Sequence, residues 1–401
     1  MTNTVQHRVC TSQTGRRAAL SALALAMILV ATVVASRPLQ GQTFTVLYAF
    51  TGGVDGGLPL AGLVRDGAGN LYGTTFQGGA SGYGTVFKLD KTGEETVLHS
   101  FTAGWDGAYP QAGLVRDGAG NLYGTTVGGR RGSVVFRLNA NGKETVLHTF
   151  DGADGSDPMA GLVRDAAGNL YGTTAHGGQG GCDHGCGVVF KLDRTGKETV
   201  LHSFTGTGGD GAYPYAGLIR DAAGNLYGTT VQGGSSDYGT VFKLDKTGKE
   251  TVLYSFTGTG GDGGAPDAGL VPDAARNLYG TTFGGGFADY GTVFKLDNTG
   301  KETVLYSFTG GADGEWPDAG LVLDAKGNLY GTTFSGGIHQ ISGTVFKLDQ
   351  TGNFTLLHEF TGGDDGSGPQ AGLIWDKAGN LYGTTCCGGA YTWGVVFKLT
   401  P

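Results

Sequence analysis

Short apolar runs separated by turn residues recur along this chain and predict β-strands. The unit from Pro59 to Phe101 contains four such runs, PLAGLVRD, GAGNLYGTT, GTVFKLD and ETVLHSF. Each is rich in Val, Leu, Phe, Tyr or Thr and is bounded by Gly, Asp or Asn, a pattern typical of strands joined by tight turns. No window shows the 3.6-residue period of an amphipathic helix. We therefore predict an all-β fold with four strands, a to d, in each unit.

The unit is repeated seven times. The string Asn-Leu-Tyr-Gly-Thr-Thr in strand b marks each copy, and successive copies are 48 to 56 residues apart. It begins at Asn70, Asn121, Asn169, Asn225, Asn277, Asn328 and Asn380. This period lies in the range of β-propeller blades.

Two of the connections in the unit have fixed lengths and two vary. The a–b and c–d turns never change length, whereas the b–c loop runs from 7 residues after Thr126 to 13 after Thr174, and the d–a loop also varies. Turns alternate between the two ends of an antiparallel sheet, so the variable b–c and d–a loops share one face. Functional residues gather on loops held by a rigid scaffold, which makes this face the expected working side.

The two ends of the repeat region predict a closed ring. The last unit ends after its strand c at residues 395–399, and a spare d-type strand stands at residues 44–50. If the spare strand completes the last unit, every blade has four strands and no sheet edge is left open. Residues 43–401 are therefore predicted to form one seven-bladed β-propeller of four antiparallel strands per blade.

The N-terminal segment 1–35 reads as a secretory signal. Arg16 and Arg17 precede an apolar stretch from Ala18 to Ala35 that ends in small residues. At about 18 residues the stretch is also long enough for an uncleaved anchor, which would be the chain's only predicted contact with a membrane. Residues 36–42 form a short linker. We expect a secreted, periplasmic or cell-surface protein.

Composition narrows the range of partners. The 80 glycines show no Gly-X-Y period and stand at fixed turn positions. The net charge of −8 without a basic stripe argues against nucleic acid as a partner, because such binding depends on Lys and Arg at phosphates. A monomer is expected.

The consensus unit resembles a known bacterial repeat. It reads AGLVRDxAGNLYGTTxxGGxxxxGTVFKLDxxGxETVLHSFTGxxDGxxP. It is similar to the GloVer (Gloeobacter–Verrucomicrobium) tandem repeat of the choice-of-anchor family, over residues 43–401. The resemblance implies an exported bacterial protein and brings no established activity. The Gly-Asn-Leu-Tyr core is also similar to NHL-type propellers, which is an analogy at the level of fold.

Each d–a loop contains Asp-Gly-x-x-Pro, and the sevenfold repeat predicts a ring of carboxylates at the channel mouth. A calcium ion or polar ligand could bind such a ring through oxygen atoms. The alternative, which we favour, is that each Asp stabilises its own turn. The residues are Asp55, Asp106, Asp154, Asp210, Asp262, Asp313 and Asp365.

The longest b–c loop, in blade 3, holds His176, Cys182, His184 and Cys186. Oxidising conditions outside the cell favour a Cys182–Cys186 disulfide over a zinc site. Another histidine, His339, lies in the b–c loop of blade 6, and Cys386-Cys387 in blade 7 could be oxidised or reduced.

Aromatic residues also collect on the variable loops, where Trp and Tyr are suited to stacking on sugars. They are Trp105, Tyr109, Tyr213, Phe287, Trp316, Tyr391 and Trp393. No nucleophile, base and metal set stands out from the repeats, and no metal site is assigned. We therefore favour a non-catalytic binding or scaffold protein for a glycan, peptide or surface partner. The alternative is an extracellular lyase or lactonase with a metal at the channel mouth.

Overall fold

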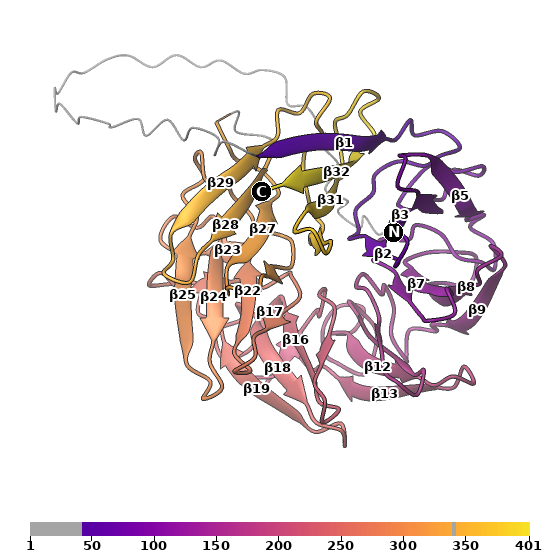
Figure 1. Cartoon of the computed structure of the whole chain (residues 1–401). Helices are drawn as coiled ribbons and strands as arrows, with labels where there is room; N and C mark the ends of the chain where they lie inside the picture. Colours follow the sequence, from indigo (N-terminus) through magenta and orange to yellow (C-terminus); the bar gives the residue numbers. More distant parts are fainter. Residues whose placement is uncertain (1–41, 339–341) are drawn as a thin grey trace, which may run out of the picture. The chain divides into compact units, whose positions relative to one another are not determined.

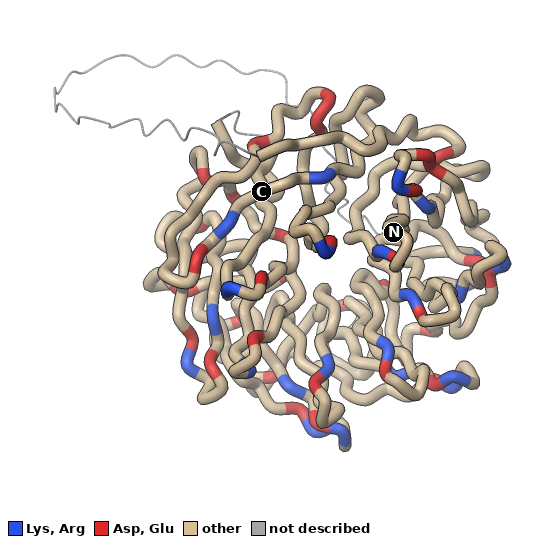
Figure 2. The backbone as a smooth tube through the Cα atoms, viewed as in Figure 1, with Lys and Arg blue, Asp and Glu red and all other residues tan. Residues whose placement is uncertain are grey.

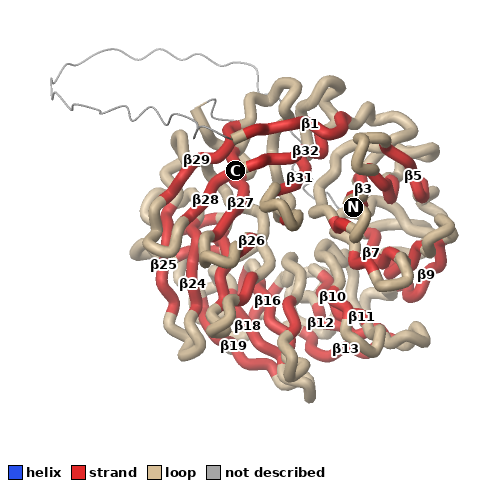
Figure 3. The backbone as a smooth tube through the Cα atoms, viewed as in Figure 1, coloured by secondary structure: helices blue, strands red, loops and turns tan. Residues whose placement is uncertain are grey.

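The computed structural model describes residues 42–338 and 342–401, all of which belong to one compact unit. Seven four-stranded antiparallel sheets stand around a ring, and no helix occurs in either described range (Figures 1 and 3). The predicted all-β, seven-bladed propeller is therefore confirmed. The expected signal segment 1–35 lies outside the described residues, as does the linker 36–42 except for Gln42.

Each blade runs outward from strand a to strand d, with hydrogen bonds in the order a-b-c-d. The a strands are β2 (Val64–Arg65), β6 (Val115–Arg116), β10 (Val163–Arg164), β15 (Ile219–Arg220), β21 (Val271–Pro272), β26 (Val322–Leu323) and β30 (Ile374–Trp375). The b strands are β3 (Leu71–Thr75), β7 (Leu122–Thr126), β11 (Leu170–Thr174), β16 (Leu226–Thr230), β22 (Leu278–Thr282), β27 (Leu329–Thr333) and β31 (Leu381–Thr385). The c strands are β4 (Thr85–Leu89), β8 (Val134–Leu138), β12 (Val188–Leu192), β18 (Thr240–Leu244), β24 (Thr292–Leu296), β28 (Thr344–Leu348) and β32 (Val395–Thr400).

The d strands lie at the periphery (Figure 1). They are β5 (Glu95–Ser100), β9 (Glu144–Thr149), β13 (Glu198–Ser203), β19 (Glu250–Ser255), β25 (Glu302–Ser307), β29 (Phe354–Glu359) and β1 (Thr43–Ala49). Two small ribbons join d–a loops to b–c loops, β14 (Gly211–Ala212) with β17 (Gln232–Gly233) and β20 (Gly263–Gly264) with β23 (Gly284–Gly285).

The ring closes through the first described strand. β1 pairs antiparallel with β32, from Thr43 opposite Thr400 to Ala49 opposite Val395, and so becomes strand d of blade 7. This is the closure that the spare N-terminal strand predicts. The pairing covers the edge of β32 that would otherwise be open.

Glycines and threonines of the inner strands join the blades around the channel. A Cβ atom added to Gly62 would lie 3.3 Å from the carbonyl oxygen of Gly372, and the equivalent glycine of each blade meets its neighbour in the same way. Next to this contact, a threonine of strand b donates a hydrogen bond to a backbone carbonyl of the next blade, as Thr384 Oγ1 does to the Ala61 oxygen at 3.1 Å. These contacts identify strand a as the innermost strand.

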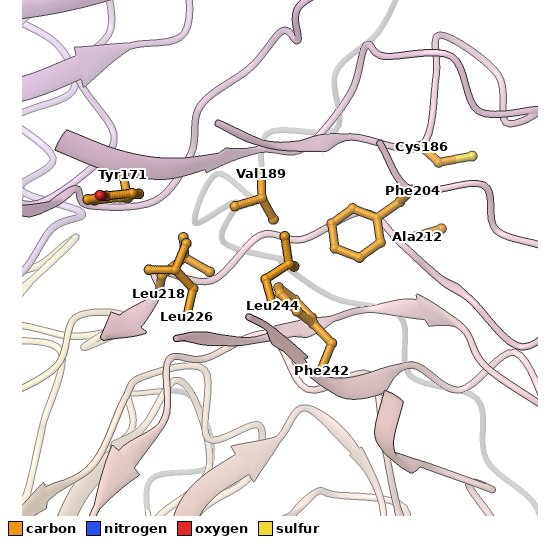
Figure 4. Close-up of a cluster of buried hydrophobic side chains, with 9 residues drawn as sticks. All are labelled: Tyr171, Cys186, Val189, Phe204, Ala212, Leu218, Leu226, Phe242 and Leu244. Atoms are coloured by element: carbon orange, nitrogen blue, oxygen red, sulfur yellow. The ribbon is translucent and has the colours of Figure 1, made fainter. Parts of the chain in front are cut away.

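The hydrophobic core lies between blades. Figure 4 shows the cluster at blades 3 and 4, where Phe204 at the end of one d strand meets Phe242 of the next c strand edge to face, with ring centroids 5.1 Å apart. The same Phe–Phe contact recurs at all seven interfaces, at 5.0 to 5.4 Å. Each such pair contributes about 0.5–1.5 kcal/mol beyond the area it buries.

The surface of the ring carries charges of both signs. Figure 2 shows acidic and basic residues spread around the ring, with no sector occupied by basic residues alone. Within 42–338 and 342–401 there is no helix of the length and apolarity that a membrane crossing needs.

Candidate functional site

The inner ends of the seven d–a loops form the candidate site. The residue before the strand a proline is left-handed in every blade, with φ between 53° and 64°. Its side chain differs from blade to blade although the repeats are nearly identical. The seven residues, here called the mouth ring, are Leu58, Tyr109, Asp157, Tyr213, Ala265, Trp316 and Gly368.

Neighbouring elements hold the backbone of the mouth ring. In blade 4 the Tyr213 N–H donates to the Cys186 carbonyl of the preceding b–c loop at 2.8 Å, and the Tyr213 carbonyl accepts from Val231 N–H at 3.1 Å. Equivalent bonds hold Tyr109 and Trp316. A residue clamped between two blades in this way can be kept in a conformation that it would otherwise avoid.

Aromatic members of the mouth ring lie against residues that follow strand b of the preceding blade. Trp316 stacks on Phe283 with ring centroids 5.6 Å apart and an interplanar angle of 13°. Tyr109 lies 5.1 Å from the ring of Phe76. Phe76 is buried, whereas Tyr109, Phe283 and Trp316 are half-buried.

Blades 3 and 4 bring three polar side chains of the mouth together. His176 Nδ1 lies 3.0 Å from Asp157 Oδ2, and its ring meets the Tyr213 ring edge to face at 5.5 Å. Burial raises the pKa of Tyr213, and the charges of Asp183 and Asp237 add to this effect. The structure therefore unites two of the predicted residues, His176 and Tyr213, with Asp157.

The rest of the blade 3 loop lies beside this group. Cys182 and Cys186 form a disulfide, with Cα atoms 5.1 Å apart. Cys182 and Tyr213 pack against the same buried cluster, which includes Cys186. His184 is exposed on the same loop, with a φ of 64°. In blade 7 the Sγ atoms of Cys386 and Cys387 are 2.8 Å apart.

His339 lies outside the described residues, so its predicted role stays untested. No group of three or more His, Cys, Asp and Glu able to hold a metal ion occurs among the residues that the structure describes.

The remaining predicted aromatics do not join the mouth ring. Trp105 is 58% exposed, and the Arg131 guanidinium lies 3.7 Å from its ring centroid. Tyr391 is 56% exposed in the b–c loop of blade 7. Trp393 is half-buried and covers Gly52 and Gly57 of the following d–a loop, where an added Cβ would lie 2.3 and 2.7 Å from the indole. Trp393 therefore packs against the loop that leads to blade 1. Phe287, 86% exposed, covers Gly261.

The seven Asp carboxylates lie beside the outer strands, not at the channel mouth where the sequence pattern placed them. Asp262, for example, accepts bonds from Thr257 N, Thr257 Oγ1 and Tyr254 Oη of β19, at 2.8, 2.8 and 3.2 Å. The reason is geometric, because the loop turns back at each Asp, whose carboxylate accepts a bond from a residue just after strand d, as Asp55 does from Thr51 N at 2.8 Å. Calcium binding by these carboxylates stays a prediction.

Every one of these carboxylates faces a tyrosine or histidine of strand d. The pairs are Tyr48–Asp55, His99–Asp106, His148–Asp154, His202–Asp210, Tyr254–Asp262, Tyr306–Asp313 and His358–Asp365. Both side chains can reach the carboxylate with a ring N–H or a phenol O–H. This shared role explains why His and Tyr replace each other among the repeats.

A glutamate of the next blade adds a second carboxylate at five interfaces. Glu302 Oε1 is buried without a hydrogen-bond partner, and burial together with the charge of Asp262 raises the pKa of Glu302 to about 7. The corresponding glutamates are Glu95, Glu144, Glu198, Glu250 and Glu302. At the other two interfaces Phe354 stacks on Tyr306, and Phe44 stacks on His358.

Comparison between blades could have revealed two features that sequence reasoning missed. Asp157 is the only acidic member of the mouth ring, and it occurs in the blade that has His176 two residues after strand b. The mouth ring itself is marked by a position that varies, directly before an invariant proline.

Fold and site together define this protein as a seven-bladed β-propeller built from tandem repeats. The sequence matches the model of the Gloeobacter/Verrucomicrobia repeat over residues 31–184 and 179–397. The chain therefore belongs to the Gloeobacter/Verrucomicrobia repeat family. No curated protein sequence matches it.

Solved structures share the propeller fold at low sequence identity. One is the extracellular domain of a protein assigned as a one-component system from B. thetaiotaomicron, 12% identical with a TM-score of 0.58, for which 88% of this chain matches 39% of that chain. Another is a protein assigned as a 6-phosphogluconolactonase from Bacteroides uniformis, 17% identical with a TM-score of 0.51 over 78% of this chain and 88% of the other. This chain thus spans about two fifths of the first structure's length, and both similarities concern the fold alone.

Proposed function

We propose that this protein is an exported, non-catalytic binding propeller that holds a glycan at the mouth ring, on the face of the b–c and d–a loops. The observation that carries the proposal is the left-handed backbone of the ring. Six of its seven members are not glycine, although Gly368 fills the same position in blade 7. A non-glycine residue in this region costs about 1–2 kcal/mol. The chain nevertheless keeps six larger residues at this position, so their side chains are expected to serve a role other than stability.

The chemistry of the ring supports a sugar ligand. Trp316 and Tyr213 offer aromatic faces, and aromatic residues with nearby polar groups suit sugars, which have apolar faces and hydroxyl edges. Both rings have polar groups nearby. The His176 ring contacts Tyr213 and is held by Asp157. Glu315 directly precedes Trp316, and burial raises the pKa of the Glu315 carboxyl. A carboxylate or imidazole at such a place can bind hydroxyl groups.

A glycan array compares the wild-type protein with Trp316→Ala and with Trp105→Ala as the control outside the ring. We expect the wild type and Trp105→Ala to bind the same glycans, and Trp316→Ala to lose at least tenfold in affinity. Equal binding by all three proteins, or no binding to any glycan, would remove the proposal. A parallel peptide array shows whether a peptide is the ligand instead.

Export supports the choice of ligand, because glycans are abundant outside the cell. The basic and apolar pattern of residues 1–35 motivates this part of the proposal. N-terminal sequencing of the protein recovered from the medium or periplasm tests it. A start near Ser36 or Arg37 is expected, and an intact Met1 in the membrane fraction would indicate an anchor instead.

A second candidate function rests on the His176–Asp157 pair. A carboxylate that holds Nδ1 of a histidine orients Nε2 as a general base, as in hydrolytic enzymes. If the mouth is catalytic, hydrolysis of a sugar lactone by the wild type would fall at least a hundredfold in His176→Ala. Activity that is absent, or unchanged in the variant, would leave binding as the function.

A further inference from the structure

On the opposite face of the propeller, where the a–b turns lie, an arginine ends strand a in blades 1 to 4 and in no other blade. The last residue of strand a is Arg65, Arg116, Arg164 and Arg220 in those blades. Each guanidinium lies 5.7–5.9 Å from the ring centroid of a strand b tyrosine in the preceding blade. That tyrosine donates to the Asp of its own a–b turn, as Tyr171 does to Asp165 at 3.1 Å. The chain thus places its own cation beside each of these Tyr–Asp pairs.

In blades 5, 6 and 7 the arginine is replaced by Pro272, Leu323 and Trp375. At the interface of blades 6 and 7, Trp375 meets Tyr330 edge to face at 4.8 Å. A cavity of about 390 Å³, widely open to solvent, lies at this point. Its lining includes Leu323, Asp324, Tyr330, Trp375, Asp376 and Lys377.

The acidic groups of the cavity remain negatively charged. Burial opposes ionisation of Asp324, yet hydrogen bonds from Asn328, from backbone amides and from Tyr330 lower its pKa. Asp376 behaves in the same way, with a pKa of about 2. Asp165 has Arg220 beside it to offset its charge, and no arginine stands at this place next to Asp324.

Two lysines lie near the cavity and do not take the arginine's place. Lys347 lies 5.8 Å from the Tyr330 ring centroid, but Lys191 lies at the same position on Tyr171, where Arg220 is also present. The lysine therefore accompanies the arginine in a complete interface. Lys377 is exposed at the cavity rim, where its charge would weaken the attraction for a cation.

We propose that this cavity binds an organic cation with an apolar stem, a guanidinium or alkylammonium group, at the interface where Trp375 replaces the chain's own arginine. The cation lies beside Asp324 and Tyr330, and Trp375 supplies an aromatic surface, to which cations are attracted. Leu323 contacts the stem. The site is on the other face from the mouth ring and is independent of the proposed glycan binding.

Isothermal titration calorimetry with agmatine tests the proposal on the whole chain. We expect saturable binding with one site per chain, and no binding of the uncharged analogue in which a urea replaces the guanidinium. Trp375→Arg, which gives blade 7 the residue of blades 1 to 4, should weaken agmatine binding at least tenfold. Pro272→Arg, the same change at an interface away from the cavity, should leave binding unchanged, and Lys377→Gln should strengthen it two- to fivefold.

Absence of agmatine binding, equal binding of the urea analogue, or unchanged binding by Trp375→Arg would overturn the proposal. If Trp375→Arg does not fold, Trp375→Leu removes the aromatic surface by introducing the residue of blade 6, and it should also weaken agmatine binding; unchanged binding would again overturn the proposal. A short capped peptide with one central arginine separates the sources of the cation. Tighter binding of the peptide than of agmatine indicates a protein partner, and equal binding indicates a small amine or guanidine.

Discussion

At the scale of single residues, the repeat separates side chains that serve the blade from those that serve a ligand. The strand d position accepts His or Tyr because either one can bond the Asp of the following loop, as His148 does at 2.8 Å and Tyr306 at 3.0 Å. The mouth-ring position accepts residues as different as Asp157, Ala265 and Trp316 because its backbone, not its side chain, is what the neighbouring blades hold. Side chains at the mouth-ring position can therefore differ from blade to blade according to function.

The cost of the mouth ring can be measured at Tyr213. Tyr213→Ala and Tyr213→Gly both delete the aromatic ring and its contact with His176. Only glycine also relieves the left-handed backbone, at a φ of 59°. We therefore expect Tyr213→Gly to be more stable to urea unfolding than Tyr213→Ala by about 1 kcal/mol. A glycine variant that is less stable than the alanine variant would show that this conformation is not strained.

At the scale of elements, five of the seven interfaces between outer strands bring two carboxylates together, one from the Asp of a d–a loop and one from a strand d glutamate of the next blade. The structure buries Glu302 Oε1 near Asp262 and Tyr254, with no hydrogen-bond donor for it. Phe354 and Phe44 fill the same place at the other two interfaces and stack on the ring beside them. A glutamate at this position is therefore most stable when it is protonated.

This interface predicts a dependence of stability on pH. The folded-state pKa of Glu302, about 7, lies above the value of an exposed glutamate, so its contribution to stability is complete below about pH 4.5 and is lost as the pH rises through 7. Glu302→Gln should therefore raise the melting temperature at pH 8 by about 1–3 °C and have less effect at pH 5. At this interface the strand d residue that bonds Asp262 is Tyr254 and not a histidine, so this pair adds no histidine titration beside Glu302 between pH 5 and pH 8.

Thermal melts of the wild type and Glu302→Gln at pH 5 and pH 8 provide the measurement. Lys301→Gln, an exposed change one residue away, serves as the control and should alter the two melting temperatures equally. A stabilising effect of Glu302→Gln that is the same at both pH values would contradict the assigned burial.

Sequence patterns predicted these elements well because the unit is repeated seven times. The fixed a–b and c–d turn lengths located the faces, and the Asn-Leu-Tyr-Gly-Thr-Thr strings located strand b. The course of the d–a loop was not predictable, since the direction in which Asp262 points depends on Tyr254, eight residues earlier. Contacts between blades, such as Glu302 with Asp262 or Trp375 with Tyr330, depend on the curvature of the ring, which no local pattern encodes.

At the scale of the whole molecule, closure of the ring depends on one strand. β1 supplies the outer strand of blade 7, and Phe44 packs on Phe360 and Phe397 of the last two blades. A shared blade of this kind fixes the first and last repeats to each other. The sequence predicted this closure, because a missing strand at one end was matched by a spare strand at the other.

Removing Thr43–Ala49 should open the ring. The variant leaves β32 as an unpaired edge and exposes apolar residues that β1 covers, so we expect association into oligomers and a melting temperature lower by at least about 10 °C. Light scattering after size-exclusion chromatography measures the association. A peptide of residues 42–50 added in excess should reduce it, whereas a scrambled peptide should not. A variant that remains monomeric with an unchanged melting temperature would show that β1 is dispensable for closure.

The central claim is that function lies in the mouth ring, the position that differs between otherwise equal blades. It is tested most directly on a glycan array, with the wild type beside a variant in which Leu58, Tyr109, Asp157, Tyr213, Ala265 and Trp316 are all replaced by glycine, the residue of blade 7. We predict that this variant keeps the far-ultraviolet circular dichroism of a folded propeller and loses the glycan signals of the wild type. A folded variant that retains the wild-type binding profile would contradict the claim.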